Sequence, residues 1–337
     1  MALSRPSFLS ACLSLGISAA AYRVLPAIAS ATEFELLRRI SPVILDRTNA
    51  NAMPDAEGNM QLNQGHWTAV VFQRVAMPLF WVGAVENDQQ KVDAAWRAVD
   101  AAFAHQQPDG SFATGDGSPM PPTDMAFWLD ALGHGLIVLQ ESPLGATSGR
   151  RIAGVLPGIA RGASWLQQPG KLAVLEKGDL LGTNRVLIDA NAFASVAVLL
   201  GDARFMTISD RLRDEALARL TPQGVLPENG GFDSSYQAVS LLHASYLYLR
   251  APNSGLFNGL TIALNRELEA IDAAGNVSTA GNTRTGGQER VFGQVKRLDY
   301  SSVILGLLYS GLVLGRQDGV DAGTRVFRHA YHYSANL

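Results

Sequence analysis

The sequence predicts an all-α protein, an α/α toroid built from about five or six helical hairpins packed side by side. Three observations support this fold class. Segments with helical apolar spacing alternate with Gly/Pro-rich connectors, and strand patterns are sparse. A connector pattern recurs at intervals of 60, 54 and 51 residues, and the helices after each connector are more apolar than those before it. An open α-solenoid is the alternative arrangement.

The composition allows a large core. The 337 residues are 47% hydrophobic and 17% charged, below the roughly 25% charged residues of typical soluble domains. Length alone suggests about two domains, but a closed ring of hairpins accounts for the same length as one. The formal net charge of -3 offers no general attraction for nucleic acid, so no nucleic-acid partner is expected.

The N-terminus has the pattern of an export signal. Arg5 precedes an apolar stretch at 8–22, and the small residues Ala29-Ser30-Ala31 follow. We therefore expect a signal at 1–31, a single toroid domain at 32–337, and a periplasmic or secreted location; an uncleaved N-terminal anchor is the alternative. The single cysteine, Cys12, lies in this segment, so the mature chain would have no disulfide and no cysteine nucleophile.

Two kinds of helix alternate along the chain. The amphipathic helices, expected in an outer layer, are 89–105, 149–167, 203–220 and 255–271. The nearly all-apolar helices, expected in an inner layer, are 66–82, 124–139, 184–199, 234–249 and 299–314. Helical segments at 34–45 and 320–331 complete the two ends. The most apolar stretch, 303–315, is too short to span a bilayer, so no stable membrane insertion is expected after signal removal.

The recurring connector pattern predicts where a functional site lies. Its glycines are Gly110, Gly170, Gly224 and Gly275. The long connectors at 108–123, 169–183, 221–234 and 272–298 all lead from an outer helix into an inner one, so they should meet at one end of the toroid and form a common cleft.

Residues at the starts of the inner helices suit a sugar ligand. Aromatic rings can stack on the C–H faces of a sugar, and amides, carboxylates and guanidinium groups can pair with its hydroxyls. Arginine also matches the carboxylate of an acidic sugar. The candidates for substrate contact are Trp67, Asp124, Trp128, Arg185, Asp189, Gln237, Arg284, Glu289 and Tyr300.

Three short motifs carry a resemblance to a known group of enzymes. Asn184 lies in Thr183-Asn184-Arg185, Tyr236 in Phe232-Asp233-Ser234-Ser235-Tyr236-Gln237, and Arg290 in Gln288-Glu289-Arg290. Their spacings are 52 and 54 residues, close to one repeat each. With the predicted fold and export, this resembles the α/α-toroid polysaccharide lyases over roughly residues 60–315. The resemblance implies cleavage of a uronate-containing polysaccharide by β-elimination, without an essential metal or other cofactor.

In such a reaction, each residue type has a role. Asn184, helped by Arg185 or Arg290, would neutralise the uronate carboxylate so that the C5 proton becomes acidic. Tyr236 would take that proton and then protonate the leaving oxygen. Many such lyases also have a histidine near the tyrosine, and this connector has none. His66, at the first inner helix, is the expected substitute, because His243 lies two turns deeper in its helix.

Two other functions remain open. A glycoside hydrolase of the same fold, acting on uronosyl oligosaccharides, would use two carboxylates, with Asp124 and Asp189 as the preferred pair and Glu228, Asp233 and Glu289 in reserve. Asp130 is less accessible by position. A non-catalytic polysaccharide-binding or assembly protein is the third possibility. Asn184 also fits a simple helix cap. His329 and His332 lack a convincing carboxylate partner, so no metal site is expected.

Overall fold

The computed structural model describes residues 31–49, 53–60, 66–178, 182–291 and 293–334. Almost all of the predicted export signal therefore lies outside the described residues.

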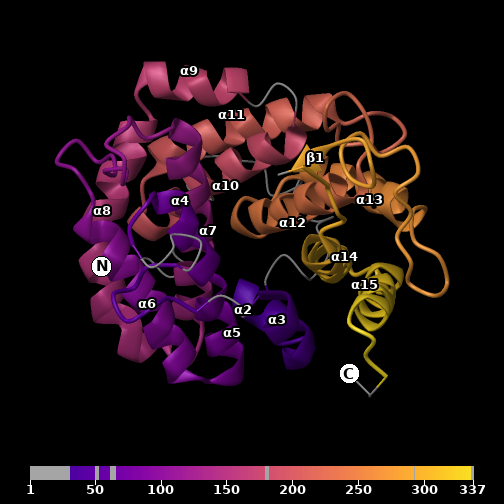
Figure 1. Cartoon of the computed structure of the whole chain (residues 1–337), viewed down its shortest axis with the longest axis horizontal. Coiled ribbons are helices and arrows are strands. Elements are labelled where there is room, and N and C mark those ends of the chain that lie inside the picture. The colour runs from indigo at the N-terminus through magenta and orange to yellow at the C-terminus, as the bar shows by residue number, and fades with distance from the viewer. Residues whose placement is uncertain (1–30, 50–52, 61–65, 179–181, 292, 335–337) are drawn as a thin grey trace, which may run out of the picture.

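Five pairs of antiparallel helices form the body of the protein (Figure 1). The inner helices are α5 (Pro78–Glu86), α7 (Pro122–Glu141), α10 (Thr183–Leu200), α12 (Ser234–Arg250) and α14 (Tyr300–Leu314). Their outer partners are α6 (Gln89–Ala104), α8 (Gly145–Leu166), α11 (Ala203–Arg219), α13 (Ser254–Leu268) and α15 (Gln317–Ala330). The remaining elements are α2 (Glu33–Leu37), α3 (Pro42–Asn49), α4 (Val70–Gln73), η4 (Arg74–Ala76), α9 (Pro169–Gly178), β1 (Arg290–Val291) and β2 (Gln294–Val295).

The inner helices form a ring. Each packs against the next in the order α5, α7, α10, α12 and α14, and α3 packs against both α14 and α5. Figure 1 shows α2 and α3 between these two sides of the molecule. The N-terminal helices thus close the ring, and the predicted α/α toroid is confirmed.

Burial explains the composition of the inner helices. Every residue of α14 from 303 to 313 is buried. Among the described residues, α10 is the one helix long and apolar enough to cross a membrane, and 78% of it is buried inside the protein. Its apolar character is accounted for by packing against neighbouring helices on several sides.

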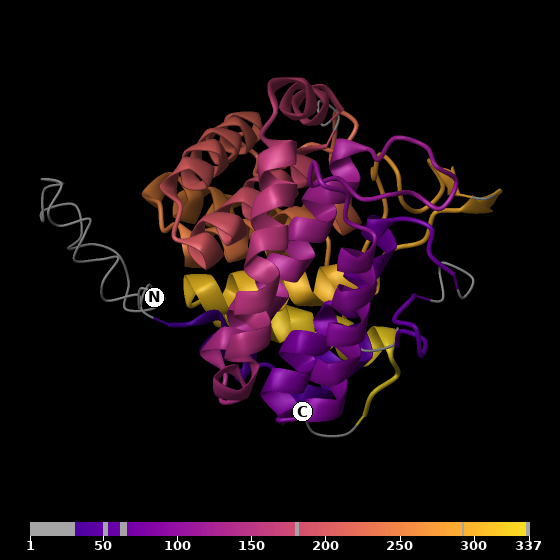
Figure 2. The ribbon, with the colours of Figure 1, turned by 90° about the vertical axis from the view of Figure 1, so that its left-hand side faces the viewer.

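The long connectors meet at one end of the ring, as predicted. Neighbouring connectors are joined by backbone hydrogen bonds, from Gly115 N to Thr68 O (2.7 Å) and from Thr183 N to Pro227 O (3.0 Å). The β1–β2 hairpin belongs to the same end, and Figure 2 shows it projecting on the same side as the connectors of the N-terminal half.

Two local expectations were wrong. The helix expected at 66–82 is divided into α4, η4 and α5, and Pro78 stands at the start of α5. The connector expected at 169–183 contains α9, which begins at Pro169. Proline is favoured in the first turn of a helix, because the missing N–H has no intrahelical partner there.

The recurring glycines have a common structural role. Gly110, Gly224 and Gly275 have φ values of +96°, +81° and +88°. A Cβ on each would lie 2.3 to 2.5 Å from a backbone carbonyl oxygen of a later outer helix, at Arg161, Ile262 and Arg325 respectively. Gly58 has the same geometry against Arg97 and was missed. Gly170 lies in α9 with open space around it and is not an equivalent position.

Two of these turns are each held by a buried glutamine. Gln237 Nε2 donates to Gly224 O (2.8 Å) and Ala263 O (3.1 Å), and its Oε1 accepts from Leu226 N (2.9 Å). Gln73 makes the corresponding bonds to Gly58 O, Ala98 O and Met60 N. Gln237 was expected to contact substrate. Instead it is fully buried, and its amide joins a connector to an outer helix.

Candidate functional site

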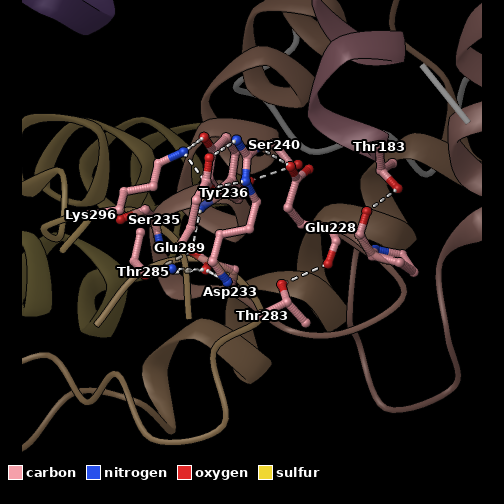
Figure 3. A network of polar contacts seen from close by, with 12 residues as sticks. Thr183, Glu228, Asp233, Ser235, Tyr236, Ser240, Thr283, Thr285, Glu289 and Lys296 are labelled. Atoms are coloured by element: carbon pink, nitrogen blue, oxygen red, sulfur yellow. Dashed lines mark hydrogen bonds and ion pairs between the residues drawn. The ribbon is translucent and has the colours of Figure 1, made fainter. Parts of the chain in front are cut away.

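Tyr236 stands at the centre of a polar network at the connector end (Figure 3). Asp233 caps α12, because its Oδ1 accepts from Ser235 N (3.1 Å) and Tyr236 N (3.4 Å). Lys296 Nζ donates to Tyr236 Oη at 2.5 Å. The Arg284 guanidinium carbon lies 4.4 Å from the centroid of the tyrosine ring. The phenol is therefore held between two cationic groups.

Both cations are also bound to carboxylates. Arg284 makes a two-point contact with Glu289, at 2.6 and 3.1 Å, and its Nη1 donates to Glu228 Oε1. Lys296 Nζ donates to Glu289 Oε2 at 3.0 Å. The hydrogen bonds from Arg284, with further help from Lys296, lower the pKa of Glu289 to about 2. Glu289 is therefore an anchor that stays ionised.

The connector that carries Arg284 is fixed by the same residue that caps α12. Asp233 Oδ2 accepts from Arg284 N (2.9 Å) and Thr285 N (2.8 Å). Asn282 Oδ1 accepts from Ser234 N (3.1 Å), and Asn282 Nδ2 donates to Thr285 Oγ1 (2.6 Å). Because one carboxylate positions both segments, Arg284 and Tyr236 are placed together.

Glu228 and Asn184 lie beside this network. The Glu228 side chain is only 4% exposed, and burial raises its pKa although Arg284 opposes the shift. Within the described residues, neither Glu228 Oε2 nor Asn184 Oδ1 has a hydrogen-bond partner. A Cβ at Gly182 would lie 2.7 Å from the former and 2.8 Å from the latter. The two oxygens therefore flank the same backbone position.

A second polar group lies on α7 and η4. The Arg74 guanidinium carbon is 4.7 Å from the centroid of the Phe127 ring. Burial lowers the pKa of Arg74, against the attraction of Asp130 and Asp124. Burial also raises the pKa of Asp124, against the attraction of Arg74. A carboxyl group that holds its proton to a higher pH is suited to act as an acid.

Partly accessible side chains lie along one face of α7 and one face of α12. On α7, Asp124 and Phe127 are partly accessible, and on α12 so are Tyr236, Val239 and His243. These positions have the three- and four-residue spacing of a single helix face. The two faces meet where His243 Nδ1 lies 3.4 Å from Asp130 Oδ2.

The opposite end of the axis is closed. Glu33 of α2 is fully buried, with Oε2 2.7 Å from His134 Nδ1 and Oε1 3.1 Å from Arg250 Nε. Arg250 Nη1 donates to Asn191 Oδ1 at 2.7 Å. His134 stacks on Tyr246 with ring centroids 3.9 Å apart. This buried network joins α2 to α7, α10 and α12.

The predicted site residues fall into separate places. Tyr236, Arg284 and Glu289 share the polar network at the connector end, which we call the rim network. Asn184 lies beside Glu228, and the charge of Arg185 acts on Glu228. Arg290 instead lies on β1, exposed, with Nη1 donating to Gly293 O (3.0 Å). Its side chain is directed along the hairpin and not toward Tyr236.

Several aromatic candidates are anchors in this structure. Trp67 stacks on His105 at 4.1 Å, and its Nε1 donates to Ala113 O at 2.7 Å. Trp128 was expected to contact substrate, but it is fully buried and has no exposed face. Tyr300 is half-buried, with its ring centroid 6.3 Å from that of His329.

The remaining candidates differ in exposure. His66 is exposed at the start of its connector. Asp124 is half-buried, whereas Asp189 is 1% exposed and lies on a buried face of α10. The preferred hydrolase pair thus combines an accessible carboxyl group with an inaccessible one.

Two residues of these polar groups, Lys296 and Arg74, were given no role from the sequence. Lys296 is separated from Tyr236 by 60 residues, and no helical periodicity relates a connector residue to a helix start. Arg74 belonged to a helix that was predicted only as apolar. A charged residue within an otherwise apolar inner helix was the available signal. Within the described residues, no group of three or more His, Cys, Asp or Glu is placed to hold a metal.

Comparisons with known proteins identify the fold. No family profile matches the sequence, and no curated protein is significantly similar to it. The structure is similar to that of D-mannose isomerase (TM-score 0.54, 12% identity, covering 92% of this chain and 88% of the other). It is also similar to unsaturated glucuronyl hydrolase from Bacillus sp. GL1, responsible for the degradation of glycosaminoglycan (0.57, 12%, 90% and 85%). A further match is a UGL structure with dGlcA-Glc-Rha-Glc (0.55, 12%, 89% and 84%). At this identity the similarity establishes the α/α-toroid fold.

Proposed function

We propose that this chain is a carbohydrate-active enzyme that cleaves a uronate-containing saccharide by β-elimination. The similarity of its fold to sugar-processing toroids supports the substrate class. The observation that carries the reaction type is the position of Tyr236 at the connector end of the ring, where its hydroxyl oxygen accepts from Lys296 at 2.5 Å. Proton removal by a tyrosine uses its phenolate form, and in the proposed step the Lys296 ammonium lies beside the charge on that oxygen.

The proposed step balances without water. Tyr236 Oη removes the C5 proton, the C–H electrons form the C4–C5 double bond, and the C4–O bond breaks. The proton on Tyr236 then passes to the leaving glycosidic oxygen. Asn184 and Arg185 stabilise the negative charge that develops on the uronate carboxylate. Arg290, exposed on β1, has no part in this scheme.

A hydrolase acting on uronosyl oligosaccharides is the second candidate. Burial raises the pKa of both Asp124 and Glu228, which suits a general acid, and Asp124 is partly accessible. The fold similarity to unsaturated glucuronyl hydrolase is consistent with this alternative. A non-catalytic saccharide-binding protein is the reading that remains if neither reaction occurs.

Product mass and ultraviolet absorbance separate these functions. The protein is incubated with polyuronates, acidic exopolysaccharides and oligosaccharides that end in an unsaturated uronate. Elimination creates the absorbing double bond, and the product masses sum to that of the substrate. Hydrolysis adds one water and, on unsaturated ends, removes the absorbance. Release of products with one added water and no new absorbance would refute β-elimination.

Substitution of the tyrosine tests the residue assignment. Tyr236→Phe should lower turnover by about 10²- to 10⁴-fold, the usual contribution of general acid–base catalysis. Tyr333→Phe is the matched control, because Tyr333 packs on Phe327 near the C-terminus, and it should leave turnover unchanged. Full activity of Tyr236→Phe would remove Tyr236 from the mechanism.

We also propose that the protein is exported. This rests on the N-terminal pattern of Arg5, the apolar stretch and Ala29-Ser30-Ala31. Intact mass of protein recovered outside the cytoplasm should correspond to a chain beginning at Thr32. Recovery of the full-length chain in the membrane fraction would instead support an uncleaved anchor.

A further inference from the structure

A groove lies on the outer wall of the ring, between the outer helices α6 and α8, which Figure 1 shows side by side. Its volume of about 630 Å³ is within the range of about 300 to 1,000 Å³ of small-molecule sites. The lining residues come from both helices and include Trp96, Asp100, Thr147, Arg150, Arg151 and Gly154. Their three- and four-residue spacings place each set on one face of its helix. The groove is therefore bounded by two facing helix surfaces, separate from Tyr236 on α12.

The sequence of α8 explains why space is left between these helices. Near the connector end the helices are in contact, because Gln106 Nε2 donates to Gly158 O (2.9 Å) and a Cβ on Gly158 would lie 2.5 Å from the Phe103 ring. One turn earlier in α8, a Cβ on Gly154 would meet no atom within 4 Å. The groove is therefore open at Gly154, where no side chain fills it.

Two arginines with different surroundings line this groove. The Arg151 guanidinium carbon lies 4.8 Å from the centroid of the Trp96 ring, and Arg151 Nη2 donates to Asp100 Oδ2 at 2.5 Å. These contacts hold Arg151 over Trp96, which is only 1% exposed. Arg150 is exposed and, within the part of the chain that the structure describes, has no hydrogen bond or ion pair. Two guanidinium groups and one carboxylate give the groove a net positive charge, which attracts an anion.

The groove also has acceptors for hydroxyl groups. Asp100 uses Oδ2 for Arg151 and its side chain is 61% exposed, so Oδ1 can accept a further bond. The Thr147 hydroxyl donates to Leu144 O (2.9 Å), so it can only accept from a ligand. Sulfate supplies no donor for these acceptors. A uronate fits both features, because its carboxylate can pair with Arg150 while its hydroxyls donate to Asp100 and Thr147.

We propose that this groove, which we call the outer groove, binds one uronate unit of an acidic saccharide. This rests on the proposed function in taking a uronate saccharide as the ligand. It adds a second binding site on the outer helices, separate from Tyr236 at the connector end. The outer groove holds the saccharide on the protein without reacting with it.

Tryptophan NMR tests the outer groove without requiring turnover. The chain has five tryptophans, and Trp96→Phe assigns the indole N–H signal of Trp96. The purified protein is titrated with glucuronate, galacturonate and mannuronate, which have no glycosidic bond to cleave, to saturation or to the solubility limit. At least one uronate should shift the Trp96 signal and leave that of Trp165 in place, because Trp165 lies on α8 beside Lys171 but outside the groove. If none shifts the Trp96 signal, the proposal is overturned.

Related ligands test the chemistry of the groove. Glucose, galactose and mannose lack the carboxylate and should bind about tenfold more weakly than the corresponding uronate, the loss expected for hydrogen bonds to a charged group. Sulfate has the charge but no donors, and it should also bind more weakly. If the neutral sugar or sulfate shifts the Trp96 signal at the same concentration as the uronate, a uronate site is refuted.

Matched substitutions separate the groove from general effects. Gly154→Leu should fill the groove and abolish the shift, and the fold should be kept because leucine favours a helix more than glycine does. Gly149→Leu is its control, since Gly149 also has open space around it but does not line the groove. Arg150→Gln should weaken uronate binding about tenfold, whereas Arg97→Gln, at an exposed position of α6 outside the groove, should leave it unchanged. Unaltered affinity in Gly154→Leu or in Arg150→Gln would overturn the proposal.

Turnover of polyuronates is measured on the same preparation. A Trp96 shift without ultraviolet product keeps the outer groove and refutes elimination at Tyr236. Product formation without any Trp96 shift does the reverse.

Discussion

At the scale of single residues, burial divides the charged groups of the toroid into two classes. Glu289 is partly exposed and keeps its charge through Arg284 and Lys296. Glu33 and Arg250 have no such access to solvent and rely on each other and on their immediate neighbours. Removing one member of a buried ion pair leaves an uncompensated charge. The network around Tyr236 is therefore open to solvent in part, whereas the network around Glu33 is not, and we expect its loss to affect stability.

Glu33→Gln should be strongly destabilising. The substitution leaves Arg250 buried and charged without its carboxylate, and such losses cost about 3–5 kcal/mol. The measurement is urea unfolding followed by circular dichroism. Glu35→Gln is the control, since glutamine also serves at this capping-box position of α2, and it should change stability by less than about 0.5 kcal/mol. Equal effects would show that the Glu33 contacts are energetically unimportant.

His134 should make stability depend on pH. Burial, the largest cause, lowers its pKa in the folded protein, although Glu33 opposes the shift. Below the unfolded value of about 6.5, the unfolded chain binds a proton that the folded chain does not. Stability is therefore lost as pH falls through this value, by up to about 1.4 kcal/mol per pH unit. Urea unfolding between mildly alkaline and mildly acidic pH measures this slope.

The control for this pH effect is His134→Gln, which removes the titrating group. Its unfolding free energy should fall less steeply on acidification than that of the unsubstituted protein, whatever its absolute stability. Identical slopes would contradict a buried, neutral His134.

At the scale of elements, the sequence-based helices agree with the structure where local pattern determines them. The outer helix expected at 203–220 is α11, Ala203–Arg219, and the inner one at 234–249 is α12, Ser234–Arg250. Apolar spacing and caps are local signals, so they are readable along the chain. Contacts between connectors cannot be read from local pattern, because they join residues that are far apart in the sequence. The pairing of Lys296 with Tyr236 depends on how the β1–β2 segment folds back over α12.

Gly170 was wrongly included in the predicted repeat, because the contact that defines the repeat is also not local in sequence. Gly170 matches the others in sequence, but Pro169 begins α9 there. Gly58 was not predicted, because it follows the short helices α2 and α3 and not a long outer helix like those before the other glycines. What identifies an equivalent glycine is its approach to an outer-helix carbonyl, a contact that local sequence does not reveal.

The glycine turns should be sensitive to a methyl group. Gly224→Ala combines a positive φ of +81° with a Cβ 2.5 Å from Ile262 O, so the turn must shift. We expect a loss of about 3 kcal/mol in the free energy of unfolding, from the left-handed backbone and overpacking together. Gly117→Ala, also at positive φ but with open space around it, should lose only about 1 kcal/mol. Similar losses would argue against the close contact.

At the scale of the whole molecule, the ring depends on its first helices. Leu36, Leu37 and Leu45 are almost fully buried, and α2 and α3 fill the space between α14 and α5. Without them, the apolar sides of two inner helices would face solvent, and Arg250 would lose its carboxylate. Closure of the axis and stability of the ring therefore depend on the same short segment.

Two truncations test this dependence. A chain beginning at Thr32 retains Glu33 and the Thr32 cap of α2, so it should unfold in one cooperative transition. A chain beginning at Met53 loses both helices, exposes the inner layer and leaves Arg250 unpaired. It should bind the dye ANS and lack a sharp calorimetric transition, as expected when apolar surface is uncovered. If the shorter chain unfolds as cooperatively as the longer one, α2 and α3 cover a ring that is already complete.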